Sequence, residues 1–135
     1  MRDISTFIRN KVLLVRRLKA CWDNHWSFWL ALGVNSVAVE NIPRSTKFTH
    51  PYGISIHYKS PIGENCWIRQ NVTIGRRYAD DELPDDYPKI GNNVLLCAGA
   101  TVLGDVIVGD NAVVGAGAIV LRDVPQNVTV TGVWR

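Results

Sequence analysis

With 135 residues and a formal net charge of +3, the chain has room for one domain with a modest core. The charge is too small to indicate nucleic-acid binding, although a few local Arg and Lys could hold an anionic small ligand. No apolar run approaches the roughly 20 residues that span a bilayer, and the first residues do not lead into the apolar core of a signal peptide. The three cysteines have no metal-ligand spacing, which suits a reducing compartment. We therefore predict a cytoplasmic protein.

The first 41 residues are predicted to be an N-terminal helical segment. Residues 3–20 place apolar side chains near helical spacing and fill much of the remainder with Arg and Lys, which indicates a basic amphipathic helix. Such a helix can lie on an anionic membrane surface, but we favour packing of its apolar face on the coil or on a neighbouring subunit. A second short helix is expected over residues 21–34, where three tryptophans recur at helical spacing.

A six-residue repeat runs from Ile90 to Pro125, and two of its columns hold no polar residue. The first column contains Ile90, Leu96, Val102, Val108, Val114 and Val120. The fifth column contains Val94, Ala100, Val106, Ala112, Ala118 and Val124. A period of six fits neither an amphipathic helix nor an alternating strand. It is the signature of a parallel β-helix, in which each hexad forms one side of a triangular coil and Gly, Asn and Asp form the corners.

The hexads begin at Ile42 and are interrupted near His50. Ile54 is expected in the first column, yet the next clear first-column residue, Ile62, follows eight residues later instead of six. Two extra residues therefore lie close after His50. A break in a regular coil beside a titratable side chain is where function is expected.

A second interruption falls between Ile74 and Ile90. This stretch is polar and contains prolines, so residues 75–89 are predicted to leave the coil as a protruding loop. The coil domain is predicted to span residues 42–135. Cys66 falls in an inward column and should be inert, whereas Cys97 falls in an outward one.

Six segments of the coil carry a family likeness: Phe48–Ile54, Gln70–Gly75, Pro88–Gly91, Val114–Ala118, Asp123–Pro125 and Gly132–Val133. Through them the chain resembles the left-handed β-helix acyltransferases built from hexapeptide repeats, and within these the serine acetyltransferases and their polysaccharide-modifying relatives. The resemblance implies an all-β solenoid, a left-handed parallel β-helix. It also implies a homotrimer with active sites in grooves between adjacent coils, acetyl-CoA as the donor and no metal.

The same resemblance assigns residues to the donor. Ala98 and Ala116 flank the pantetheine arm, because small side chains let it lie against the coil, and Leu121 and Arg122 follow it. Arg122 and Arg135 are candidates for the CoA phosphates, since a multiply anionic nucleotide needs cations. Ordinary solvated charge is the alternative for both.

At the catalytic histidine of the family stands His50, and the residues around it depart from the serine acetyltransferase pattern. Thr49 replaces the Asp that precedes this histidine, Tyr87 replaces the histidine of the protruding loop, and Asp86 replaces the Arg before it. Thr49 and Tyr87 are expected to contact the acceptor, with loop packing as the alternative for Tyr87. These departures disfavour L-serine, whose two charges want both a carboxylate and a guanidinium partner.

The predicted chemistry is direct acetyl transfer with a single base. An alcohol must lose its proton as it attacks a thioester, and a largely neutral imidazole can take that proton and return it to the departing sulfur. We assign this role to His50, with His57 as a secondary candidate. A backbone N–H of the coil is expected to stabilise the oxyanion.

The sequence therefore predicts an acetyl-CoA-dependent O-acetyltransferase that acts on an acceptor hydroxyl, in a small molecule or a glycan, with a sugar of polysaccharide biosynthesis favoured. L-serine O-acetylation in cysteine synthesis is the alternative. Two other classes remain open: a zinc carbonic anhydrase on the same coil, which needs three histidine ligands, and a non-catalytic assembly module.

Overall fold

The computed structural model describes residues 34–35, 42–78 and 86–135. Within these ranges every regular element is a short β-strand, and no helix is present. The helices predicted for the N-terminal segment lie outside the described residues. From that segment only Val34–Asn35 is described, and it forms strand β1.

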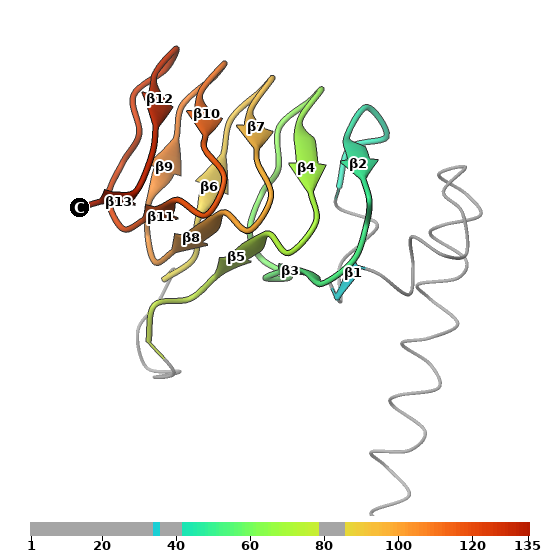
Figure 1. Ribbon diagram of the computed structural model, residues 1–135, viewed down its shortest axis with the longest axis horizontal. Coiled ribbons are helices and arrows are strands. Elements are labelled where there is room, and N and C mark those ends of the chain that lie inside the picture. Colours follow the sequence, from blue (N-terminus) through green and yellow to red (C-terminus); the bar gives the residue numbers. More distant parts are fainter. Residues whose placement is uncertain (1–33, 36–41, 79–85) are drawn as a thin grey trace, which may run out of the picture.

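The strands lie in three parallel sheets that form the sides of a coil (Figure 1). The six-stranded sheet has the order β1-β3-β5-β8-β11-β13, the five-stranded sheet the order β12-β10-β7-β4-β2, and the third pairs β6 with β9. The bounds are β2 Lys47–Thr49, β3 Ile54–Ile56, β4 Trp67–Arg69, β5 Thr73–Gly75, β6 Lys89–Ile90, β7 Leu95–Leu96, β8 Thr101–Leu103, β9 Ile107–Val108, β10 Val113–Val114, β11 Ile119–Val120, β12 Thr129–Val130 and β13 Val133–Trp134.

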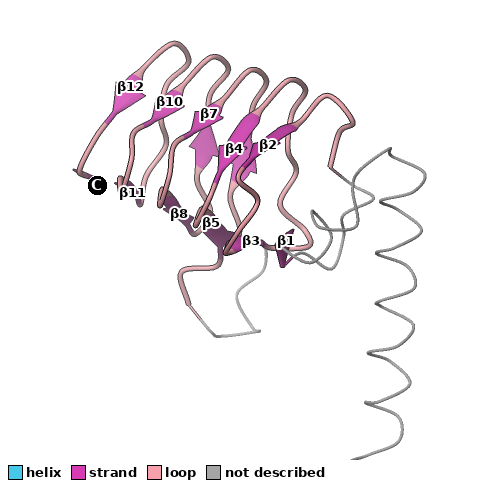
Figure 2. Cartoon of the chain, turned by 45° about the vertical axis from the view of Figure 1, so that its right-hand side comes forward, coloured by secondary structure: helices cyan, strands magenta, loops and turns pink. Residues whose placement is uncertain are grey.

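Each coil visits the five-stranded, the six-stranded and the two-stranded sheet in turn, and the next coil stacks in register on it (Figure 2). Leu95 therefore lies beside Val113, and Thr101 beside Ile119. Single bridges from Ile62 to Ile90 and from Val108 to Val124 extend the third side. The predicted left-handed parallel β-helix of hexapeptide repeats is confirmed.

The interior of the coil is filled by the two apolar columns. Every residue of both columns between Ile90 and Val124 is buried, and Cys66 is fully buried with them, as predicted. Burial raises the pKa of the Cys66 thiol, which keeps it protonated. The pattern has two polar exceptions, Thr46 and Ser60, both buried in the first coil.

Three stacks of turns join the three sides. The His50 corner, from the five- to the six-stranded sheet, comprises residues 50–53, 70–72, 97–100 and 115–118. The loop corner, from the six-stranded to the third sheet, comprises residues 57–61, 76–78, 86–88, 104–106 and 121–123, and residues 79–85 of the predicted loop lie outside the described residues. The asparagine corner closes each coil with a left-handed residue, namely Asn65, Asn93, Asn111 or Asn127. No helix in the described part of the chain is long and apolar enough to cross a membrane.

Candidate functional site

His50 follows directly after β2 and begins the turn into β3. Its φ is 54°, in the left-handed region that non-glycine residues seldom adopt, and its side chain is exposed. The carbonyl oxygen of His50 accepts a hydrogen bond from the backbone N–H of Tyr52 at 2.7 Å, which tightens the turn. The imidazole is therefore carried on a constrained backbone and faces solvent within this chain.

The turn that carries His50 is two residues longer than the turn beside it. Thr49 pairs with Arg69 and Ser55 pairs with Thr73, so the first coil uses five residues (50–54) where the next uses three (70–72). The predicted two-residue insertion is thus found, and it lies at the His50 corner itself. An insertion at a corner pushes the turn outward because the strands on both sides keep their register.

One column assignment from the sequence is wrong. Ile54 was expected in the first column, but Ile56 is the residue that pairs with Ile74, and Ile54 stands level with Val72 in the fifth column. Both isoleucines are buried on either side of Ser55, so hydrophobicity alone does not show whether Ile54 or Ile56 belongs to the first column. Counted from Ile56, the hexads are regular again.

Ala98 and Ala116 belong to the same corner as His50. The backbone N–H of Asn71 donates to Tyr52, that of Gly99 to Gln70, and that of Gly117 to Ala98, which stacks the four turns. A methyl group built on Gly117 would meet no atom within 4 Å. Ala98–Ala100 and Gly115–Ala118 therefore form a small-residue strip on the later turns of this corner, and Gln70 and Asn71 lie between this strip and the His50 turn.

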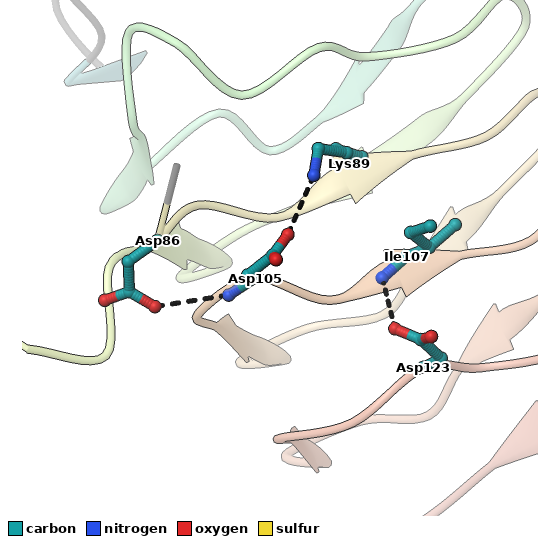
Figure 3. A network of polar contacts seen from close by, with 5 residues as sticks. All are labelled: Asp86, Lys89, Asp105, Ile107 and Asp123. Atoms are coloured by element: carbon teal, nitrogen blue, oxygen red, sulfur yellow. Dashed lines mark hydrogen bonds and ion pairs between the residues drawn. The ribbon is translucent and has the colours of Figure 1, made fainter. Parts of the chain in front are cut away.

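The loop leaves the coil at the end of β5 and is clamped where it leaves and where it returns. The Asp86 carboxylate accepts hydrogen bonds from the backbone N–H groups of Arg77 at 3.0 Å, Tyr78 at 3.1 Å and Asp105 at 3.2 Å. The Arg77 guanidinium donates to the carbonyl oxygen of Leu121 in a coil further along. Asp86 thus ties the two stems of the loop to the coil, and Figure 3 shows its bond to Asp105.

Glycine is required beneath this clamp. Gly104 has a φ of 89°, and a methyl group built on it would lie 3.1 Å from both the Arg77 Nε and the Asp86 Oδ1. Next to it, Lys89 forms an ion pair with Asp105 at 2.7 Å, and Asp123 accepts from the N–H of Ile107 at 2.8 Å (Figure 3). The loop stems are therefore held by a polar ladder on the coil surface.

Tyr87 lines a pocket at the loop corner. Its ring lies parallel to the His57 ring, with the centroids 5.5 Å apart and the planes 17° apart. The Tyr58 ring lies on His57 at 4.7 Å. A cavity of about 480 Å³ opens there, and it is lined by Tyr58, Lys59, Ser60, Pro61, Ile62 and Tyr87.

The imidazole of His57 accepts a backbone hydrogen bond and has a lowered pKa. Its Nδ1 accepts the backbone N–H of Lys59 at 3.3 Å. Burial, assisted by the positive charges of Arg76 and Lys59 and opposed by Asp86, lowers the pKa of His57. The sequence names His57 only as a secondary candidate, because no spacing rule shows that the first coil's turn lies beside the loop.

The remaining donor candidates lie away from His50. Leu121 and Arg122 follow β11 at the loop corner, where the Arg122 guanidinium stacks on the Trp134 ring at 4.5 Å. The Trp134 indole N–H in turn donates to the carbonyl oxygen of Asp123 at 3.0 Å. Arg135 is exposed and follows β13, the strand at the end of the six-stranded sheet.

Within a single chain, the two halves of the predicted site therefore lie on different corners. Thr49 and His50 lie at the His50 corner with the small-residue strip, whereas Tyr87 lies at the loop corner with Arg122. His50 and His57 are on different corners too. Among the described residues no group of three His, Cys, Asp or Glu side chains is placed to hold a metal ion.

Comparison with protein families matches residues 87–122 to the bacterial transferase hexapeptide (six repeats). The serine acetyltransferase of Synechococcus elongatus is 40% identical over 84 residues, which are 62% of this chain and 34% of that protein. The probable serine acetyltransferase 1 of Oryza sativa subsp. japonica is 41% identical over 67% of this chain and 29% of its own length. The chain thus spans about a third of the curated relatives it matches.

Solved structures give the same picture. The serine acetyltransferase of Neisseria gonorrhoeae in complex with serine superposes with a TM-score of 0.63 and 32% identity, over 73% of this chain and 39% of that one. Serine acetyltransferase 1 of Entamoeba histolytica in complex with L-cysteine superposes with a TM-score of 0.65 and 29% identity, over 76% of this chain and 40% of that one. By repeat, fold and sequence, the coil of this chain is a hexapeptide-repeat coil that is similar to the coils of the serine acetyltransferases.

Proposed function

We propose that the protein is an acetyl-CoA-dependent O-acetyltransferase in which His50 is the general base. The observation that carries the proposal is an exposed histidine on a two-residue insertion, at the same corner of a hexapeptide coil as the small-residue strip. Acyl transfer from a thioester to a hydroxyl needs one base and good positioning, and this arrangement offers both. A cytoplasmic location and a division into residues 1–41 and 42–135 are parts of the same proposal.

His50 moves one proton in each direction. It takes the proton of the acceptor hydroxyl as the oxygen attacks the thioester carbonyl, and the carbon–sulfur bond breaks as the tetrahedral intermediate collapses. The same proton then passes from His50 to the departing sulfur, which gives the ester and free CoA. A positioned base of this kind contributes about 10²–10⁴-fold to the rate.

The donor fits the strip along the His50 corner. Ala98 and Ala116 leave the coil backbone open to a pantetheine arm, and no side chain covers Gly117. Arg122 and Arg135 are exposed cations for the phosphates. Acetyl-CoA supplies the activated acyl group, and the residues of the chain hold it and move the proton.

Grooves between subunits would unite the two halves of the site. A trimer that places the loop corner of one subunit against the His50 corner of the next subunit brings Tyr87 of one copy to His50 of another. The separation of these two residues within a single chain supports such a homotrimer.

For the acceptor, the relatives support L-serine, the alternative in the sequence prediction, better than a sugar. Both the curated relatives and the solved structures are serine acetyltransferases. A sugar hydroxyl stays as a second candidate because of one observation. The Asp86 carboxylate is engaged by three backbone N–H groups, and Tyr87 offers a flat ring where a charged partner for an amino acid is expected.

The test is thiol release from acetyl-CoA by the purified protein, with L-serine in one reaction and nucleotide sugars and oligosaccharides in others. Turnover with L-serine supports the first acceptor, and turnover with a glycan alone supports the second. Absence of turnover with every acceptor and with water would overturn the transferase proposal.

A further inference from the structure

Behind the pocket beside the loop, His57 lies between two tyrosine rings. Tyr87 stacks on His57 with the centroids 5.5 Å apart, and Tyr58 lies at 4.7 Å with its plane tilted by 37°. Tyr58 and Tyr87 both line the cavity. Because His57 touches both of them, its position decides where the two walls stand.

His57 cannot rotate freely. The bond from the Lys59 N–H to its Nδ1 fixes the ring plane from one side, and the turn that carries it is closed by the Ser60 N–H, which donates to the His57 carbonyl oxygen at 2.9 Å. The backbone N–H of His57 also donates to Ile74 in the next coil at 2.8 Å. The backbone of His57 is thus anchored by the coil and its ring is held by one hydrogen bond, whereas Tyr87 stands on the returning stem of the loop.

The cavity lining favours one kind of chemical group. The described residues that line it include two tyrosines, a serine and a lysine, and no Asp or Glu is among these described residues. The Lys59 ammonium lies 5.8 Å from the Tyr58 ring centroid, and the Lys89 ammonium lies 5.9 Å from that of Tyr87. An oxygen-rich group, a carboxylate or a set of hydroxyls, is complementary to this lining, whereas an isolated ammonium is not.

We propose that this pocket binds the oxygen-rich part of the acceptor and that His57 is its positioning residue, holding Tyr87 as the selective wall. The proposal rests on the proposed transferase function and identifies how its acceptor is chosen. The same chemistry is present in the carboxylate of L-serine and in the hydroxyls or carboxylate of a sugar. His57 contacts the wall, and the proton transfer belongs to His50.

Steady-state kinetics of His57→Ala, His57→Phe and Tyr78→Ala test the proposal. Loss of one stacked ring is expected to raise the KM for the acceptor about fivefold in His57→Ala, with the KM for acetyl-CoA unchanged. His57→Phe restores the stack and should return the acceptor KM to within about twofold of wild type. Tyr78→Ala is the matched control, because Tyr78 is an exposed tyrosine at the same corner that does not line the pocket.

A binding experiment separates this inference from the transferase proposal. Ligand-observed NMR is run on the His50→Ala protein, which lacks the base, with L-serine, methyl glucoside and methyl glucuronide as separate probes. At least one probe should bind, and adding His57→Ala or Tyr87→Ala should weaken that binding. The probe that binds identifies whether the oxygen-rich group comes from an amino acid or a sugar.

Three results would overturn the proposal: no binding of any probe, binding that is indifferent to His57 and Tyr87, or a His57→Phe protein as impaired as His57→Ala. A failed transferase proposal looks different, since wild-type protein would then bind a probe without releasing thiol from acetyl-CoA. Size-exclusion chromatography of each variant shows whether its assembly is intact.

Discussion

His50 shares its backbone conformation with asparagines. Among the described residues six non-glycine positions have a positive φ, and the other five are all Asn. Asparagine tolerates the left-handed region because its short amide can bond locally, whereas a histidine gains less from it. A histidine in such a place indicates that its side chain matters more than its backbone preference.

His50→Asn separates these two contributions. The substitution suits the local backbone, so the midpoint of thermal unfolding should stay equal to or above that of wild type. Acetyl transfer should fall by about 10²–10⁴-fold because the base is gone. His50→Ala is the companion variant, with equal loss of activity but lower stability by about 1 kcal/mol. An Asn variant that keeps a tenth of the wild-type turnover would exclude His50 as the base.

We expect His57 to make the stability of the fold depend on pH. Burial and the charges of Arg76 and Lys59 lower its pKa in the folded protein. The unfolded chain therefore binds a proton more readily, so this contribution is present above the ordinary pKa of about 6.5 and is lost as the pH falls through the folded value.

Denaturant unfolding of wild type and His57→Phe between pH 8 and pH 5 measures that contribution. The free energy of unfolding of wild type should decline more steeply below about pH 6.5 than that of His57→Phe, because Phe has no proton to gain. Parallel curves for the two proteins would show that His57 does not contribute.

The loop is an element whose stems depend on one carboxylate. Asp86→Ala removes the acceptor of three backbone N–H groups, so stability should fall by about 1–3 kcal/mol and trypsin should cut faster after Arg77. Asp105→Ala is the control, since its carboxylate pairs with an exposed lysine and contributes at most about 1 kcal/mol. Thermal unfolding and digestion rates measure both effects, and identical behaviour of the two variants would contradict the clamp.

The elements themselves follow from the sequence wherever the hexad count is unbroken. From Ile90 to Val124 each hexad forms one side of the coil, so periodicity alone locates the buried columns. The count fails at Ile54 because a corner can absorb two residues and leave strands apolar on both sides of the break. The pocket could not be predicted either, since His57 and Tyr87 meet only once the coil stacks.

At the scale of the whole molecule, the proposed site needs two copies of the chain. His50 and Tyr87 lie on different corners, so a site between subunits takes one residue from each. A mixture of His50→Ala and Tyr87→Ala chains should then regain activity after subunit exchange, because about a quarter of the sites in randomly mixed trimers combine both intact residues.

Equal amounts of the two variants are co-refolded and assayed for thiol release, with each variant refolded alone as the control. Recovery to about a quarter of wild-type activity supports shared sites. If the mixture shows only the average of the two controls, each site is built within one chain.

The two extra residues at the His50 corner leave the strands on either side in register, and the buried columns continue past them unchanged. In a solenoid of this kind the buried columns stabilise the fold and the corner turns can carry the reactive residues, because each coil contacts only its neighbours. Residues 50–53 therefore form an exchangeable turn, which can be lengthened, shortened or moved to another coil without redesign of the interior, and which can carry a new chemistry.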